Sequence, residues 1–200
     1  MSKDDLTPDR LPKQEPPQKP RREEEQPQQP QQQPPEFALT EEEAQRAMEL
    51  FRQEQNQLVG TMAGFLAAVV GAAAWAAVTV VTEYQIGWMA VGIGFLVGLA
   101  VRAGGKGIDQ IFGVIGATMS LVGCLLGNVF TIAYFISVDT GMSVIDVLAQ
   151  MDVAIVIELM METFQVMDIL FYALAVYFGY RYAFRQLTMD DFNRALGRIM

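Results

Sequence analysis

Histidine is absent from this sequence, cysteine occurs once, at Cys124, and proline is absent after Pro35. The lack of histidine removes the commonest general base of enzymes and the commonest protein ligand of metal ions. A single cysteine can form neither an intrachain disulfide nor a thiolate cluster for zinc. The four serines have no histidine that could activate them as nucleophiles. We therefore expect no catalytic residue, no metal site and no cofactor, and a protein that is not an enzyme.

Charge is scarce in most of the chain, because more than half of the charged residues lie at or before Glu54. All nine prolines fall in the same part of the chain, between Pro8 and Pro35. Residues 1–36 cannot bury enough apolar surface to offset the entropy lost on ordering, so they are predicted to form a disordered tail rich in proline and glutamine. No basic stripe alternates with aromatic residues, which argues against nucleic-acid binding. The first apolar run begins near Leu58, and we therefore expect no signal peptide.

A PxxPxR pattern within the tail is formed by Pro17, Pro20 and Arg22. Aromatic-lined grooves bind such segments in an extended polyproline conformation. Two interpretations remain open for the tail, namely a solvated spacer and a binding segment for a cytoplasmic protein partner.

An amphipathic cytoplasmic helix is predicted over residues 37–57. Thr40 followed by Glu43 has the spacing of a capping box, which marks the start of a helix. Ala44, Ala47 and Phe51 then recur at helical spacing and form an apolar stripe. No glycine or proline follows before Gly60, so we expect this helix to continue directly into the first membrane span.

Four transmembrane helices are predicted, at about residues 58–82, 84–102, 109–137 and 164–184. The first three stretches are nearly free of charge, and a helix needs about 20 apolar residues to cross a bilayer. The predicted fold is therefore an all-α, four-helix transmembrane bundle over residues 58–186.

The fourth span is short of apolar length. The uncharged segment between Asp168 and Arg181 is about 18 Å of helix at about 1.5 Å per residue, whereas the hydrocarbon core is about 30 Å thick. The helix must therefore bring one or both charges to the hydrocarbon edge, where a long arginine side chain can reach the headgroups.

An acidic connector, residues 139–163, joins the third and fourth spans on the extracytoplasmic side. It has a capping pattern at Ser143 and Asp146, and an apolar run that favours a surface or partly embedded helix. Glu158 and Glu162 share a helical face, which indicates either a solvated acidic face or, less simply, a divalent-cation site. Residues 187–200 are predicted to form an interfacial helix, with Thr188 and Asp191 as its capping pattern.

The orientation follows from the basic residues. All 14 lysines and arginines lie in the N-terminal part, in the loop of Arg102 and Lys106, or from Arg181 onward. With four crossings these regions share one side, which the positive-inside rule makes cytoplasmic. We expect both termini in the cytoplasm of a multi-pass protein of the inner membrane, with Arg102, Lys106, Arg181 and Arg185 at the lipid headgroups. A phosphate-binding loop at Lys106 is disfavoured, because the Walker spacing is not met.

Glycines spaced by four occur in each of the first three spans: Gly60 and Gly64, Gly94 and Gly98, and Gly123 and Gly127. Such pairs let helix backbones approach closely in lipid. They are predicted to pack helices within the chain, and the alternative is a homo-oligomer formed through one of these faces.

Polar residues at membrane depth are the remaining candidate site. Asn128 is the only amide side chain well inside a span, and Asp168 lies near the start of the fourth. Side chains of this kind often mark an ion or substrate path. They are the candidate intramembrane polar residues of this sequence.

The stretch that contains TEYQIGWMAVGIGFLVG, GKG and GCLLGN, within Thr82–Asn128, resembles a group of uncharacterised small four-span proteins of bacterial inner membranes. The resemblance implies the bacterial inner membrane as location. It implies no activity and no catalytic residues.

Three functions are compatible with these patterns. A helical bundle with few candidate catalytic or binding residues, joined to a charged cytoplasmic tail, favours a non-enzymatic membrane scaffold or adaptor. The alternatives are a small transporter or channel component, which would use Asn128 and Asp168, and an accessory subunit of a larger membrane complex.

Overall fold

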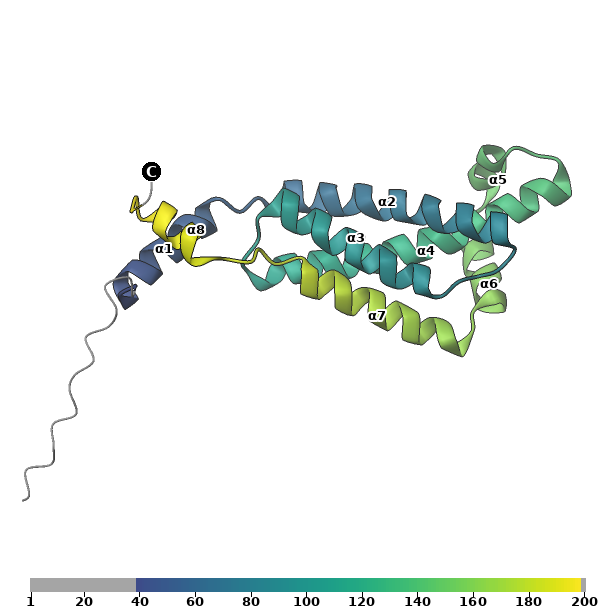
Figure 1. Cartoon of the computed structure of the whole chain (residues 1–200). Helices are drawn as coiled ribbons and strands as arrows, with labels where there is room; N and C mark the ends of the chain where they lie inside the picture. The colour runs from purple at the N-terminus through teal and green to yellow at the C-terminus, as the bar shows by residue number, and fades with distance from the viewer. Residues whose placement is uncertain (1–38, 199–200) are drawn as a thin grey trace, which may run out of the picture. The chain divides into compact units, whose positions relative to one another are not determined.

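The computed structural model describes residues 39–198, and over this range the chain forms helices without any strand (Figure 1). The helices are α1 (Glu41–Gln53), α2 (Gln57–Thr82), α3 (Trp88–Gly105), α4 (Gln110–Thr140), α5 (Val144–Gln150), α6 (Val153–Thr163), α7 (Val166–Tyr182) and α8 (Met189–Ala195). The prediction of an all-helical chain is therefore confirmed for the described residues. The predicted tail, residues 1–36, and its PxxPxR pattern lie outside them.

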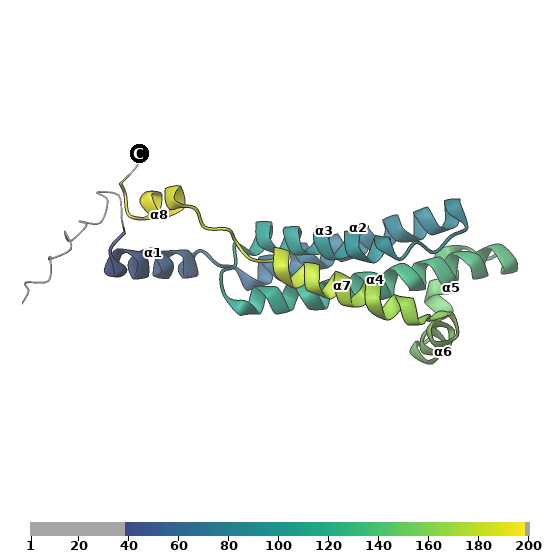
Figure 2. The same ribbon diagram turned by 60° about the horizontal axis from the view of Figure 1, so that its bottom comes forward.

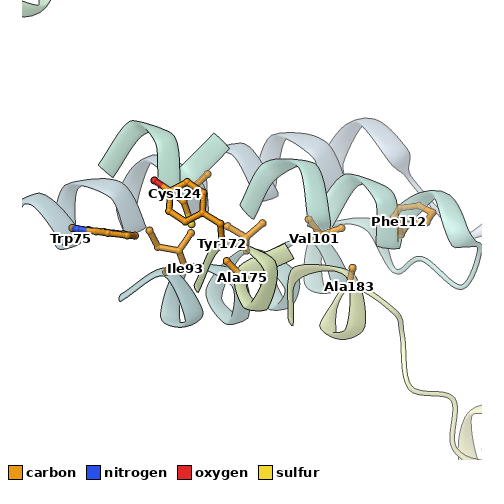
Figure 3. Close-up of a cluster of buried hydrophobic side chains, with 11 residues drawn as sticks. Trp75, Ile93, Val101, Phe112, Cys124, Tyr172, Ala175 and Ala183 are labelled. Atoms are coloured by element: carbon orange, nitrogen blue, oxygen red, sulfur yellow. The ribbon is translucent and has the colours of Figure 1, made fainter. Parts of the chain in front are cut away.

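Four helices, α2, α3, α4 and α7, pack along one another and are called the core helices below. α3 and α4 contact each other, and each also contacts α2 and α7, so α2 and α7 lie on opposite sides of the α3–α4 pair. Buried side chains from all four helices meet between them, among them Trp75, Ile93, Cys124 and Tyr172 (Figure 3). α1 and α8 lie together at one end of the core helices, and α5 and α6 lie at the other (Figures 1 and 2).

Three of the described helices, α2, α3 and α4, are long and apolar enough to cross a membrane. α4 has 31 residues and continues to Thr140, beyond the end of the predicted third span, before Gly141 ends it in a left-handed conformation. The predicted fourth span corresponds to α7, which has only 17 residues and is not among the three. The boundary residues 164 and 165 are outside α7 because Gln165 serves as its N-cap.

The three predicted capping patterns are confirmed. Thr40 and Glu43 form a capping box at α1, and Thr188 and Asp191 form another at α8. The Ser143 hydroxyl accepts a hydrogen bond from the backbone N–H of Asp146 at α5. Each cap gives a partner to a backbone N–H that the helix itself leaves unpaired.

The expectation that the first helix continues into the first span is wrong. α1 ends at Gln53, and α2 begins at Gln57 with Asn56 as N-cap, whose side-chain oxygen accepts from the Val59 N–H at 3.0 Å. The Asn56 N–H instead donates to the Gly105 carbonyl at 3.0 Å. The break therefore exists because Asn56 is bonded to the end of α3.

The six predicted glycines are all buried, and helices of the same chain cover them. Residues of α3 and α4 cover Gly60 and Gly64. Residues of α7 cover Gly94 and Gly98, and residues of α2 and α3 cover Gly123 and Gly127. A Cβ atom built on Gly94 would overlap the carbonyl oxygen of Ala175, and one on Gly116 would overlap that of Gly179. These backbones approach as closely as they do because no side chain separates them.

We predict that Gly94→Ala destabilises the core helices, whereas Gly92→Ala does not. A Cβ at position 94 meets the Ala175 backbone, which cannot move without shifting α7, and overpacking of this kind costs about 1–3 kcal/mol. A Cβ at position 92, on the same helix, meets nothing within 4 Å. Unfolding in mixed micelles with increasing SDS, followed by circular dichroism, measures both variants. Equal stability of the two variants would contradict the glycine contact.

Candidate functional site

Polar side chains gather in two clusters, one at each end of the core helices. The first surrounds Arg185, which follows the C-terminal end of α7, and is called the Arg185 cluster. The Arg185 guanidinium donates to Glu54 Oε2 at 2.8 Å and lies 3.9 Å from Asp191 Oδ1. Its central carbon lies 4.9 Å from the centre of the Phe51 ring, in the position of a cation–π contact. One side chain thus joins the end of α1 to the start of α8.

The Arg185 cluster is also bonded to the loop between α3 and α4. The Arg185 N–H donates to the Gly107 carbonyl at 2.7 Å. The side-chain oxygen Oε1 of Gln55 accepts from the backbone N–H groups of Ile108 and Asp109, at 2.9 and 3.2 Å, and the Gln55 side-chain Nε2 donates to the Asp109 carboxylate at 2.9 Å. Gln55 therefore already occupies the N–H groups of Ile108 and Asp109, which a phosphate bound at this loop would need.

Two further contacts hold α1 against α8. The Phe51 and Phe192 rings meet edge to face with centroids 5.4 Å apart, and Arg198 forms an ion pair with Glu43. The backbone N–H of Thr40 holds the pKa of the Glu43 carboxyl below its ordinary value, and the Thr188 backbone N–H lowers that of Asp191. Both carboxyl groups are therefore charged at neutral pH, as the ion pairs require.

The four residues predicted at lipid headgroups lie at this same end of the core helices. Arg181 is exposed near the end of α7, and Arg102 is half-buried in the last turn of α3. Lys106 ends α3 in a left-handed conformation with φ 48°. Arg185 differs from the other three, because carboxylates and an aromatic ring of the protein surround its guanidinium.

The second cluster surrounds Asn128 on α4 and is called the Asn128 cluster. The Asn128 amide nitrogen donates to the Tyr172 hydroxyl on α7, and its oxygen accepts from the exposed Gln85 amide at 2.9 Å. A chain of hydrogen bonds thus leads from the loop between α2 and α3 to buried side chains of α4 and α7. Neutral groups of this kind can be buried because each finds a partner.

Two buried polar atoms on the neighbouring face of α2 have no hydrogen-bond partner among the described residues: Trp75 Nε1 and Thr79 Oγ1. Their residues are 1% and 4% exposed and lie one turn apart. The Trp75 ring packs on Gly127, next to Asn128 in sequence, and the Trp75 and Tyr172 side chains lie near each other in Figure 3. Unused donors in a core are uncommon, and they mark this level of the core helices as the more polar one.

Asp168, the second predicted polar residue, is buried one turn before Tyr172 on α7. Its carboxylate accepts from the Gln165 N–H at 2.8 Å and so completes the capping box of α7. No hydrogen bond joins Asp168 to Asn128 within the described range. The structure therefore gives Asp168 a capping role and connects Asn128 to Gln85 and Tyr172 instead.

Glu158 and Glu162 both lie exposed on α6. Between residues 39 and 198, no three His, Cys, Asp or Glu side chains come together in a group that could hold a metal ion. Cys124 is a free, buried thiol.

Sequence reasoning missed Gln55, Gln85 and Tyr172 as members of these clusters. Gln55 and Gln85 lie in loops next to spans, where a glutamine has no distinctive spacing. Tyr172 could have been predicted as a neighbour of the polar site, because it lies four residues after Asp168 and therefore on the same face of one helix.

No protein-family model, no curated protein and no solved structure matches this chain. The function must therefore be argued from the two clusters and from the core helices.

We predict that Arg185→Ala weakens the contact between α1 and α8, whereas Arg181→Ala does not. The first change removes an ion pair and the cation–π contact together, at a cost of about 1 kcal/mol, which corresponds to roughly fivefold faster amide exchange. Arg181 is an exposed arginine four residues earlier and makes no ion pair among residues 39–198. Hydrogen–deuterium exchange of α1 in detergent checks both variants. Unchanged exchange of α1 in Arg185→Ala would show that the cluster does not hold the two helices together.

Proposed function

We propose that this chain is a four-span membrane protein with both termini in the cytoplasm, and that α7 is the fourth span. α7 packs along both α3 and α4, two of the three helices that can cross a membrane, and therefore lies beside them. Its surface exposes Val166, Ile169, Leu170 and Tyr177, as expected of a helix against lipid. With four spans, the basic residues fall on the side of the Arg185 cluster, which supports a cytoplasmic position for it.

The function that this arrangement supports best is that of a non-enzymatic membrane scaffold or adaptor. The observation that carries it is the Arg185 cluster, which ties the first and last described helices to each other and to the loop between α3 and α4. α1 is thereby held in place by contacts with α8 and with the loop between α3 and α4, in addition to its covalent connection to α2. The point at which the chain enters α1 is therefore fixed at this end of the core helices, as a scaffold that binds partners through its N-terminal residues requires.

The scaffold function predicts soluble partners that depend on the tail. The full chain, purified from native membranes in mild detergent, is expected to co-purify with cytoplasmic proteins that mass spectrometry identifies. Deletion of residues 1–36 should remove these proteins, because it removes the binding segment and leaves the core helices intact. Tail deletion that leaves every partner in place would contradict the scaffold function. Retention of membrane proteins alone would instead favour an accessory subunit of a larger complex.

A second candidate function, a small transporter or channel component, is favoured by one observation. The hydrogen-bond chain from exposed Gln85 through Asn128 to Tyr172 leads polar groups into helices that are otherwise apolar. Polar residues at such depth often belong to ion or proton paths.

The transport function predicts a proton flux in proteoliposomes, measured with an entrapped pH-sensitive dye. Asn128→Ala should abolish this flux, because it breaks both hydrogen bonds of the chain. Asp168→Asn removes a charge but retains a capping side chain, so it separates a charge requirement from a folding defect. Thr118→Ala, at an exposed position of α4, is the control. A flux equal to that of empty vesicles, or one unchanged by both variants, would exclude this function for protons.

A further inference from the structure

The helix α6 is apolar in sequence and is little covered by the rest of the described chain. It contacts only α4 among the described helices, and none of its residues from Val153 to Glu162 is buried. It runs across the end of the core helices in both ribbon views (Figures 1 and 2). The apolar side chains of α6 must therefore be covered by something other than the core helices.

The surface of α6 divides into three faces. Val156 and Met160 are half-buried and mark the face toward the protein. Val153, Ile157 and Met161 follow one another at four-residue spacing and form an exposed ridge, with 76%, 54% and 76% of their surfaces accessible. Glu158 and Glu162 are exposed on the third face. At 3.6 residues per turn, the ridge is centred about 80° from the face toward the protein and about 120° from the two glutamates, which lie about 160° from that protein-facing side.

The length of α7 sets the depth at which α6 lies. Its 17 residues extend about 26 Å, less than the hydrocarbon thickness of about 30 Å. Only Phe164 and Gln165 separate α6 from α7. If the cytoplasmic end of α7 lies at the inner hydrocarbon edge, its other end lies about 4 Å short of the outer edge, and the C-terminal end of α6 therefore lies at the outer edge or just below it. The capping box of Gln165 and Asp168 satisfies backbone groups at this break from within the chain, as a site poor in water requires.

The ridge is continuous with the apolar surface of α7. Ile157 and Met161 line one surface groove together with Phe164. Val166, Met167 and Leu170 then continue the exposed apolar surface over the first turns of α7. A surface that belongs to the membrane-facing side of a span is covered by lipid, and the ridge extends that surface through Phe164.

We propose that α6 is an in-plane helix of the extracytoplasmic leaflet, with the Val153–Ile157–Met161 ridge among lipid acyl chains and Glu158 and Glu162 facing the headgroups and water. This proposal rests on the proposed four-span arrangement. The occupant of the ridge is lipid, and the helix shields the outer end of the short span α7.

The test compares two neighbouring residues that lie on different faces of α6. In a Cys124→Ala background, single cysteines replace Ile157 or Glu158 and carry the fluorophore NBD in phosphatidylcholine vesicles. We expect brominated lipid to quench the label at position 157 at least threefold more strongly than the label at 158. Aqueous iodide should quench the label at 158 more strongly than the label at 157. Circular dichroism of the labelled proteins confirms that each is folded.

Two outcomes would overturn the proposal. Equal quenching of both labels by iodide, without quenching by brominated lipid, would place α6 in water. A label at 157 that neither agent quenches would show that protein, such as a second copy of the chain, covers the ridge.

A label at Leu66, which is 65% exposed on α2, separates this proposal from the four-span arrangement. If brominated lipid quenches the label at 66 but not the label at 157, α2 is in the membrane and only the placement of α6 fails. If it quenches neither, the membrane arrangement itself fails. Asp146, exposed on α5, is the control position for water.

Discussion

Close contact between helix backbones is the constraint on which the rest of this structure depends. Apolar side chains gain little from packing on one another when the alternative is lipid, so helix association in a membrane relies on close backbone approach. α7 meets α3 at Gly94 and α4 at Gly116, and both contacts are to the backbone of α7 itself. The Ser120 hydroxyl donates to the Gly116 carbonyl at 2.7 Å, so this small polar side chain is satisfied within its own helix where α7 approaches.

These glycine contacts fix the register of α7, and the two clusters depend on that register. With Gly179 against Gly116, the antiparallel α7 brings Tyr172 to the level of Asn128 and places Arg185 beside the loop of Gly107. A shift of α7 by one turn would move it about 5.4 Å and break both sets of hydrogen bonds. The two clusters differ in kind for an electrostatic reason. The charged groups of the Arg185 cluster lie in loops and short helices outside the core helices, whereas the Asn128 cluster consists of neutral amides and a hydroxyl, which cost less to bury.

The sequence is sufficient to predict the helices and their caps, because these depend on residues close together in the chain. Thr40 and Glu43, or Thr188 and Asp191, need only their own spacing. The break before α2 was also within reach, since Asn56 is a favoured N-cap residue placed directly before an apolar run. The Arg185 cluster could not be predicted, because Glu54 and Arg185 are 131 residues apart and no local pattern connects them. The same holds for Gln85 and Asn128, 43 residues apart.

The short length of α7 is explained by the same contacts. A span that is held only by lipid needs enough apolar residues to match the bilayer, whereas a packed span takes its position from its neighbours. The chain just after α7 is bonded to the loop between α3 and α4, through the Arg185 N–H and the Gly107 carbonyl. The glycine contacts of α7 with α3 and α4 hold the helix itself. In the proposed four-span arrangement, packing sets the position of α7 along its neighbours, and the length of α7 then sets the depth of α6 at its other end.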